Sequence, residues 1–153
     1  MPLRIGTPLP DLSGATAWIN GEPDPGQFVG KPVLVHFWAV SCHICHENMP
    51  TLRAWQERYA SQGLQLVGVH MPRQESDLEI ARVQEDVARL KITEPCAIDN
   101  AHAIAEAFQN EYVPAYFLFD REGKMRSRAA GYAGLAMLEG ALKRQFEMAE
   151  VTG

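Results

Sequence analysis

The chain has 153 residues, of which 46% are hydrophobic and 22% are charged, and this size and composition fit one globular domain. Its 14 lysines and arginines against 19 aspartates and glutamates give a net charge of −5, so it has no excess of positive charge with which to bind nucleic acid. No apolar run approaches the roughly 18 residues needed to cross a bilayer, and we therefore expect no membrane partner.

Short runs of β-branched and aromatic residues, bounded by glycine, proline and asparagine, predict strands. In chain order they cover residues 15–19, 33–38, 64–70, 96–98, 115–119 and 125–130. The run at 33–38 has a single polar residue, which is typical of a central strand buried on both faces. The last two runs flank a short loop with Gly123 and should form an antiparallel hairpin. The segment before residue 30 should cover one edge of the sheet.

Apolar residues at helical spacing predict helices between these strands. In chain order they cover residues 42–63, 76–91, 101–108 and 135–146. The second helix should begin at a capping box over residues 76–79, and Asp99 or Asn100 should cap the third. Helices interleaved with strands predict an α/β fold, a mixed sheet with helices on both faces, in a single domain over residues 1–153.

Three cysteines are too few for a disulfide framework, but two of them form the C-x-x-C pair Cys42 and Cys45. Cys42 follows the predicted central strand and starts a helix, where unpaired N–H groups and the helix dipole favour a thiolate. Cys45 lies one helical turn further on, within reach of Cys42. We therefore predict thiol–disulfide exchange in which Cys42 attacks a substrate disulfide and Cys45 resolves the mixed disulfide. Cys96 is expected to be a small buried core residue.

The run from Val35 to Cys45, VHFWAVSCHIC, resembles the active-site strand of the thioredoxin superfamily. Its continuation to Met49 and Pro50, the long N-terminal segment and an insertion over residues 71–110 are similar to the TlpA/ResA type of thiol–disulfide oxidoreductase. The resemblance covers nearly the whole chain. It implies a thioredoxin-like fold with an N-terminal strand extension, reversible dithiol/disulfide chemistry, and no bound cofactor or metal.

The resemblance also implies roles for residues outside the cysteine pair. Val113 and Pro114 match the family's cis-proline turn, which faces the disulfide and binds an incoming peptide through its backbone; X-Pro is the bond for which cis is accessible. His36 stands where thioredoxins carry a buried aspartate, and Asn48 where ResA-like members carry a glutamate. An imidazole could accept the proton of Cys45, but His36 could equally be an ordinary core histidine.

Two neighbours of the cysteines also depart from the family. Ser41 replaces a tryptophan, which leaves a more polar rim around the site. His43 lies between the cysteines, and as a cation near Cys42 it would stabilise the thiolate and shift the couple towards the reduced form.

We expect the substrates to be protein or low-molecular-weight disulfides, and an unidentified upstream reductase to regenerate the dithiol. The first 20 residues lack the pattern of a secretory signal, so we expect a cytoplasmic protein. In a reducing compartment the working form would be the dithiol, which favours a reductase over an oxidase.

Two other interpretations stay open. Cys42, Cys45 and His46 also have the spacing of a covalent c-type haem attachment site, although the strand before them argues against it. Thiolate and imidazole are also good donors for zinc or copper, so a metal carrier or chaperone that uses these residues and His43 is the alternative function. This interpretation needs either four converging ligands or a partner protein, and the further candidates within the chain are Cys96 and His70.

Overall fold

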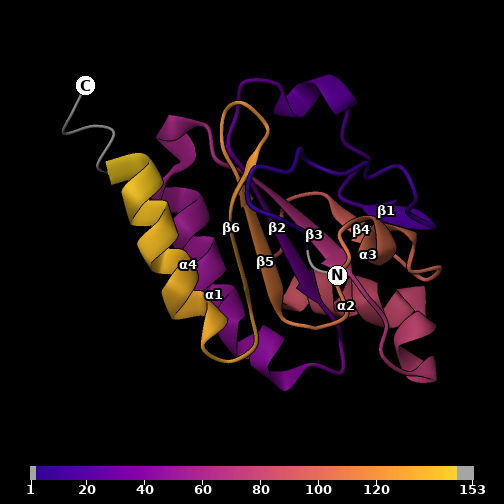
Figure 1. The fold of residues 1–153 in the computed structure, drawn as a ribbon. Coiled ribbons are helices and arrows are strands. Elements are labelled where there is room, and N and C mark those ends of the chain that lie inside the picture. Colours follow the sequence, from indigo (N-terminus) through magenta and orange to yellow (C-terminus); the bar gives the residue numbers. More distant parts are fainter. Residues whose placement is uncertain (1–2, 148–153) are drawn as a thin grey trace.

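The computed structural model describes residues 3–147, which form a six-stranded mixed sheet flanked by helices (Figure 1). The strands are β1 (Ala17–Ile19), β2 (Val33–Trp38), β3 (Gln65–His70), β4 (Cys96–Ile98), β5 (Ala115–Phe119) and β6 (Met125–Ala130). The helices are α1 (His43–Arg58), α2 (Ile80–Arg89), α3 (Ala103–Ala107) and α4 (Gly134–Leu142). The strand order is β1-β4-β3-β2-β5-β6, so the predicted α/β class and mixed sheet are confirmed.

β2 lies inside the sheet, as its apolar sequence predicts, and all of its side chains are buried. It pairs in parallel with β3 and antiparallel with β5. The end of β2 therefore lies at the same edge of the sheet as the end of β3 and the start of β5. The segment between Trp38, where β2 ends, and the cysteine pair therefore lies at this edge.

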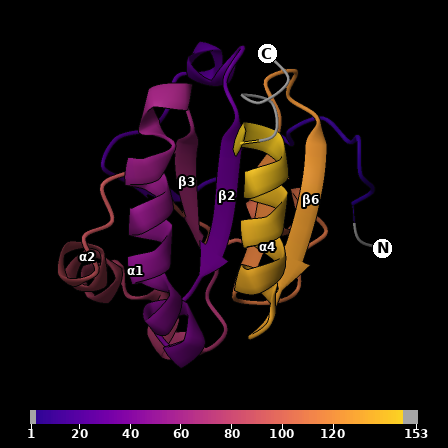
Figure 2. The same cartoon turned by 90° about the vertical axis from the view of Figure 1, so that its left-hand side faces the viewer.

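Helices cover both faces of the sheet, because alternate residues of β2 point to opposite sides. α1 and α4 lie side by side on one face (Figure 2), and α2 adds Val83 and Val87 to the same apolar cluster as Leu34 and Trp38. α3 belongs to the other cluster, through Ile104. The apolar residues of β2 thus contribute to two separate cores.

The expected insertion between β3 and the Val113–Pro114 turn contains a 3-10 turn, η3 (Glu75–Leu78), followed by α2, β4 and α3. The N-cap residue of α3 is His102, which makes no side-chain cap, but the Asp99 carboxylate predicted to cap the helix does bind its first N–H groups. Asp99 accepts hydrogen bonds from the N–H groups of Ile104 at 2.9 Å and Ala105 at 2.8 Å.

The capping box predicted over residues 76–79 is wrong, because α2 begins only at Ile80 and the N-cap residue Glu79 makes no side-chain cap. The residues in question form η3 instead. Asp77 is fully buried there and accepts a hydrogen bond from the Ser41 hydroxyl at 2.7 Å. A partner distant in sequence thus overrides a local helix-start pattern.

The N-terminal segment reaches both edges of the sheet. β1 pairs antiparallel with β4, so the predicted cover of one edge takes the form of an added strand. Earlier in the chain, the Gly6 N–H donates to the Met125 carbonyl at 2.7 Å, and the Met125 N–H donates to the Thr7 carbonyl at 2.8 Å. Between these points, Leu9 and Leu12 pack against the cluster that contains α3.

Two predicted helices end differently from the expectation. α1 stops at Arg58, a 3-10 turn η2 (Ala60–Gln62) follows, and Gly63 ends it with a left-handed φ of 87° that glycine adopts readily. α4 continues beyond Leu142 as a π turn, η4 (Lys143–Glu147). Among residues 3–147, every helix is too short or too polar to span a bilayer. The single domain over residues 1–153 stays a prediction.

Candidate active site

Cys42 and Cys45 lie at the edge of the sheet where β2 ends. Cys42 is the N-cap residue of α1, with an extended backbone, and Cys45 lies in the first turn of the helix. Their sulfurs are joined in a disulfide, and their Cα atoms are 5.3 Å apart. The predicted cysteine pair is therefore confirmed.

The backbone around the pair distinguishes the two sulfurs. Cys42 Sγ accepts a hydrogen bond from the Cys45 N–H at 3.1 Å. This N–H belongs to the group that a helix leaves unpaired at its N-terminus, and it points at the sulfur on which a negative charge would form. Both residues are buried, at 3% and 2% exposure. The helix start thus favours a thiolate at Cys42.

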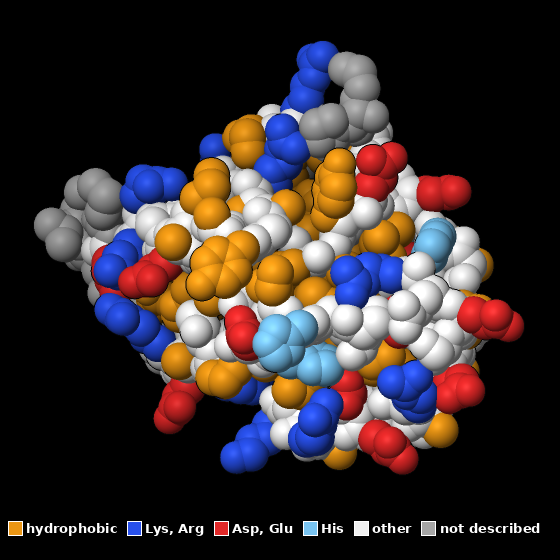
Figure 3. Space-filling model, turned by 90° about the horizontal axis from the view of Figure 1, so that it is seen from below, with side chains coloured by type: hydrophobic (Ala, Val, Ile, Leu, Met, Phe, Trp, Pro, Cys, Tyr) orange, Lys and Arg blue, Asp and Glu red, His pale blue; other side chains and the backbone are white. Residues whose placement is uncertain are grey.

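The end of the molecule that carries the disulfide also carries an apolar surface. Tyr112, Tyr132 and Met137 are 65%, 79% and 64% exposed; Tyr112 precedes β5, Tyr132 follows β6, and Met137 lies in the first half of α4. Figure 3 looks onto this end and shows hydrophobic side chains gathered in its middle, with charged and histidine side chains around them. Tyr112 and Met137 also line a groove of about 1100 Å³, together with Met71 and Phe117. Exposed apolar surface of this kind is typical of a site that binds other molecules.

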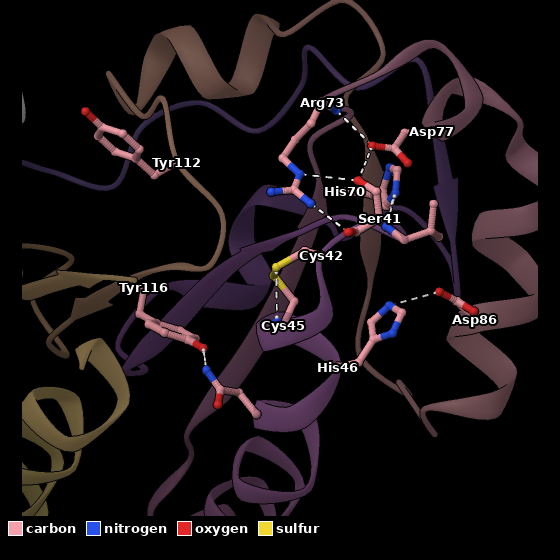
Figure 4. Close-up of a disulfide and its surroundings, with 12 residues drawn as sticks. Ser41, Cys42, Cys45, His46, His70, Arg73, Asp77, Asp86, Tyr112 and Tyr116 are labelled. Carbon is pink, nitrogen blue, oxygen red and sulfur yellow. Dashed lines mark hydrogen bonds and ion pairs between the residues drawn. A yellow bond between two sulfur atoms is a disulfide. The ribbon is translucent and has the colours of Figure 1, made fainter. Parts of the chain in front are cut away.

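The Val113–Pro114 peptide bond is cis, as the resemblance implies. The chain between Tyr112 and Tyr116, which contains this bond, passes beside the disulfide on the side away from Ser41 (Figure 4). The disulfide and the cis-proline turn, which come from distant parts of the chain, are therefore brought together.

His36 belongs to a buried cluster of charged side chains. Its Nε2 lies 2.6 Å from Glu94 Oε2, and Arg53 donates a hydrogen bond of 2.6 Å to each of the two Glu94 oxygens. Burial raises the pKa of Glu94, but the hydrogen bonds and charges of His36 and Arg53 outweigh burial and lower it to about 2. Glu94 is therefore a carboxylate, and His36 Nε2 carries the hydrogen that it donates to Glu94.

This hydrogen bond leaves the other ring nitrogen of His36 without a hydrogen in the neutral tautomer. That nitrogen, Nδ1, is buried and has no hydrogen-bond partner among the described residues. An imidazole held by a carboxylate on one side can accept a proton on the other. The role of His36 towards Cys45 therefore stays a prediction.

Arg73 and Asp77 are functional candidates that the sequence analysis did not identify. Arg73 donates to the Ser41 carbonyl at 2.7 Å, and Asp77 accepts from the Ser41 hydroxyl at 2.7 Å. His70 Nε2 accepts the Val40 N–H at 3.1 Å. The signal that could have found them is the parallel pairing of β2 and β3, which places the segments after both strands at one edge.

His70 is fully buried, and burial lowers its pKa to about 4 against the opposing carboxylates of Asp77 and Asp86. The neutral ring can therefore offer a lone pair to the Val40 N–H. The Trp38 ring packs edge-on against it, with ring centroids 5.0 Å apart. A neutral buried imidazole thus fixes the start of the active-site turn.

The histidines beside the cysteines each lie against a carboxylate. His43 Nε2 is 2.9 Å from Glu47 Oε1 on the helix surface, and His46 Nε2 is 3.1 Å from Asp86 Oδ2 of α2. Within residues 3–147, no group of three or more histidine, cysteine, aspartate or glutamate side chains gathers in a way that could hold a metal ion. The described residues therefore do not form a complete metal site by themselves.

Two further residues singled out in the sequence have structural partners. Asn48 donates to the Tyr116 hydroxyl at 2.8 Å, so the residue that replaces the family's glutamate links α1 to β5. Cys96 is a free thiol in β4 with no exposed surface, and burial raises its pKa to about 12. Its predicted place in the core is confirmed.

Comparison with known sequences agrees with this geometry. A model of the AhpC/TSA family matches residues 5–128. The thiol-disulfide oxidoreductase YkuV of Bacillus subtilis is 45% identical over 143 residues, which are 93% of this chain and 96% of YkuV. Protein DipZ of Mycobacterium bovis is 37% identical over 76% of this chain and 17% of its own length. The thiol-disulfide oxidoreductase ResA of Bacillus cereus is 28% identical over 75% of this chain and 64% of ResA.

Solved structures give the same result for the fold. The solution structure of a thioredoxin-like protein in the oxidized form matches with a TM-score of 0.83 and 44% identity, over 93% of this chain and 96% of that chain. A thiol-disulfide isomerase from Corynebacterium glutamicum matches with a TM-score of 0.79 at 20% identity, over 90% and 95% of the two chains, and supports the fold alone. The thioredoxin-like fold and the ResA-type resemblance are confirmed.

Proposed function

The chain belongs to the AhpC/TSA family and is a thiol–disulfide oxidoreductase, and we propose that it works as a reductase with Cys42 as the attacking thiol and Cys45 as the resolving thiol. The observation that carries this proposal is the place of Cys42 at the N-terminus of α1. Its sulfur accepts the Cys45 N–H there and is bonded to the Cys45 sulfur.

The reaction has two exchange steps. In the first, the Cys42 thiolate attacks one sulfur of the substrate disulfide, the substrate S–S bond breaks, and the second substrate sulfur leaves as a thiolate. In the second, the Cys45 thiol loses its proton and attacks Cys42 Sγ, so that the internal disulfide forms and the first substrate sulfur leaves as a thiolate. The substrate gains two electrons, and the protein loses two.

His36 is the proposed acceptor of the Cys45 proton. Its Nε2–H is donated to the Glu94 carboxylate at 2.6 Å, and Arg53 keeps that carboxylate ionised. The opposite nitrogen, Nδ1, is buried without a partner among residues 3–147. A carboxylate behind an imidazole fixes the tautomer and stabilises the imidazolium that forms on proton uptake. His36, with Glu94 behind it, would thus take the role that the resemblance gives to the buried aspartate of thioredoxins.

Val113 and Pro114 are the proposed contact for the substrate backbone. The cis bond lies beside the disulfide, and the groove lined by Tyr112 and Met137 begins at the same turn. This apolar surface suits a polypeptide that presents a disulfide next to hydrophobic side chains. Protein disulfides are accordingly the substrates, and low-molecular-weight disulfides remain predicted ones.

The direction of the reaction is tested by the reduction potential. The purified protein is equilibrated in graded thiol–disulfide buffers, and its free thiols are counted by alkylation and mass spectrometry. A paired transition near about −270 mV, the value for thioredoxin, would support the reductase, whereas about −180 to −120 mV would assign an oxidase or isomerase. The cytoplasmic location and the upstream reductase stay predictions.

The roles of the two cysteines are tested by trapping. Cys45→Ser should accumulate a mixed disulfide with the substrate, because the resolving thiol is missing, and Cys42→Ser should not. Cys96→Ala is the matched control, since that thiol is buried in β4 away from solvent. If Cys42→Ser trapped the substrate as well as Cys45→Ser does, the assignment of the two roles would be wrong.

A further inference from the structure

The segment that follows β3 holds the turn before Cys42. His70, the last residue of β3, accepts the Val40 N–H at 3.1 Å. Asp77, in η3, accepts the Ser41 hydroxyl at 2.7 Å. One segment therefore fixes both of the residues that precede the attacking sulfur.

Arg73 lies in the same segment and brings a positive charge to this turn. Its guanidinium donates to the Ser41 carbonyl at 2.7 Å and, through Nε, to the Ser41 hydroxyl at 3.2 Å. The Ser41 carbonyl belongs to the peptide group that joins Ser41 to Cys42. The guanidinium that binds it is therefore held next to the backbone of Cys42. In Figure 4 the Arg73 side chain extends over the turn towards Cys42. Its backbone N–H donates to Asp77 at 2.9 Å.

Arg73 differs from the other cations near the disulfide. His43 Nε2 lies 2.9 Å from Glu47, and His46 Nε2 lies 3.1 Å from Asp86, so each of these rings already has a carboxylate partner. None of the ion pairs found among the described residues includes the Arg73 guanidinium. Its charge is therefore available to a thiolate next to it.

We propose that Arg73 is a positioning residue of the exchange reaction, which holds its charge beside Cys42 and favours the thiolate that attacks the substrate. The inference rests on the proposed role of Cys42 as the nucleophile. A positive charge close to an acidic group favours the ionised form of that group. More of the Cys42 thiol is then ionised at neutral pH, which speeds the attack, and the dithiol form gains stability relative to the disulfide.

Two other polar groups lie near Cys42 and bear on the stability of its thiolate, the Asp77 carboxylate and the Tyr116 hydroxyl. Asp77 contributes a buried carboxylate, but it binds the backbone of Arg73 and the hydroxyl of Ser41 and leaves the guanidinium free. On the β5 side, Tyr116 presents a hydroxyl that accepts a hydrogen bond from the α1 side. The Ser41 hydroxyl accepts a hydrogen bond from Arg73 Nε and so helps to hold the arginine at the turn.

The test is the pH dependence of alkylation of Cys42 in the reduced protein, followed by mass spectrometry of the Cys42 peptide. Arg73→Gln should raise the midpoint by about one pH unit and slow alkylation at pH 7 roughly three- to tenfold. The shift should shrink at high salt, because Arg73 is exposed and its field is screened. Arg73→Lys, which keeps the charge, should recover most of the midpoint. Arg121→Gln removes an equal charge from the turn after β5, at the opposite end of the sheet, and should have no effect.

A midpoint that stays unchanged in Arg73→Gln would overturn the inference, as would equal shifts in the glutamine and lysine variants. Because Arg73 is exposed, an unchanged thermal unfolding midpoint should accompany the expected result. A wild-type protein in which Cys45 is alkylated before Cys42 would instead refute the proposed nucleophile, so the two failures are distinguishable.

Discussion

Replacing Glu94 by glutamine should reduce the free energy of unfolding by about 3 kcal/mol at pH 7. The buried carboxylate is stabilised by charged partners, and the neutral glutamine amide cannot form ion pairs with them. A pKa that falls from 4.5 to about 2 in the folded protein corresponds to this amount at about 1.4 kcal/mol per pKa unit. The partners are His36 and Arg53, each within 2.6 Å of a Glu94 oxygen. Removing one member of a buried charge pair typically costs about 3–5 kcal/mol, which is consistent with this value.

The assay is urea unfolding of the oxidised protein, followed by tryptophan fluorescence. Because the folded pKa of Glu94 lies below the unfolded one, its contribution is complete above pH 4.5 and is lost as the pH falls towards 2. The Glu94→Gln variant should lack that acid-dependent loss. Glu85→Gln, at an exposed position of α2, is the matched control and should stay close to wild type. A loss below about 1 kcal/mol for Glu94→Gln would refute the reasoning.

Three further predictions concern stability. The folded pKa of His70 is about 4 against 6.5 when unfolded, so stability should fall by about 3 kcal/mol as the pH drops from 6.5 to 4, and a slope that survives in His70→Gln would exclude this cause. Gly68→Ala would bring a Cβ within 3.2 Å of the His36 ring and should cost about 1–3 kcal/mol in urea unfolding, whereas Gly26→Ala, with nothing within 4 Å, should be neutral; equal effects would contradict the packing argument. Asp99→Ala removes two hydrogen bonds from the start of α3 and should cost about 1–2 kcal/mol; a wild-type unfolding midpoint would show that the cap is dispensable.

The parts of the fold and site that depend on local sequence were predictable. β2 is an apolar run with one polar residue, and Cys42 caps α1 while Cys45 lies in its first turn, so their pairing follows from spacing alone. Val113 and Pro114 needed the resemblance, because no local pattern distinguishes a cis from a trans proline.

The contacts that were not predictable join residues distant in the chain. His36 and Glu94 are 58 positions apart, and Ser41 and Asp77 are 36 positions apart. Sequence periodicity gives the order of the elements but not which loop residues meet at a sheet edge. A helix-start pattern at Asp77 was misleading for this reason, since its carboxylate is taken by a partner from another segment.

The contacts of the N-terminal segment set an order of events during synthesis. This segment leaves the ribosome before the strands that it contacts, since Thr7 finds its partner at Met125 and Ala17 pairs with Ile98. Neither partner is available until most of the chain has emerged. The segment therefore docks late, and the transient species before docking exposes the backbone of both outer strands, which makes it the stage most open to intermolecular strand pairing.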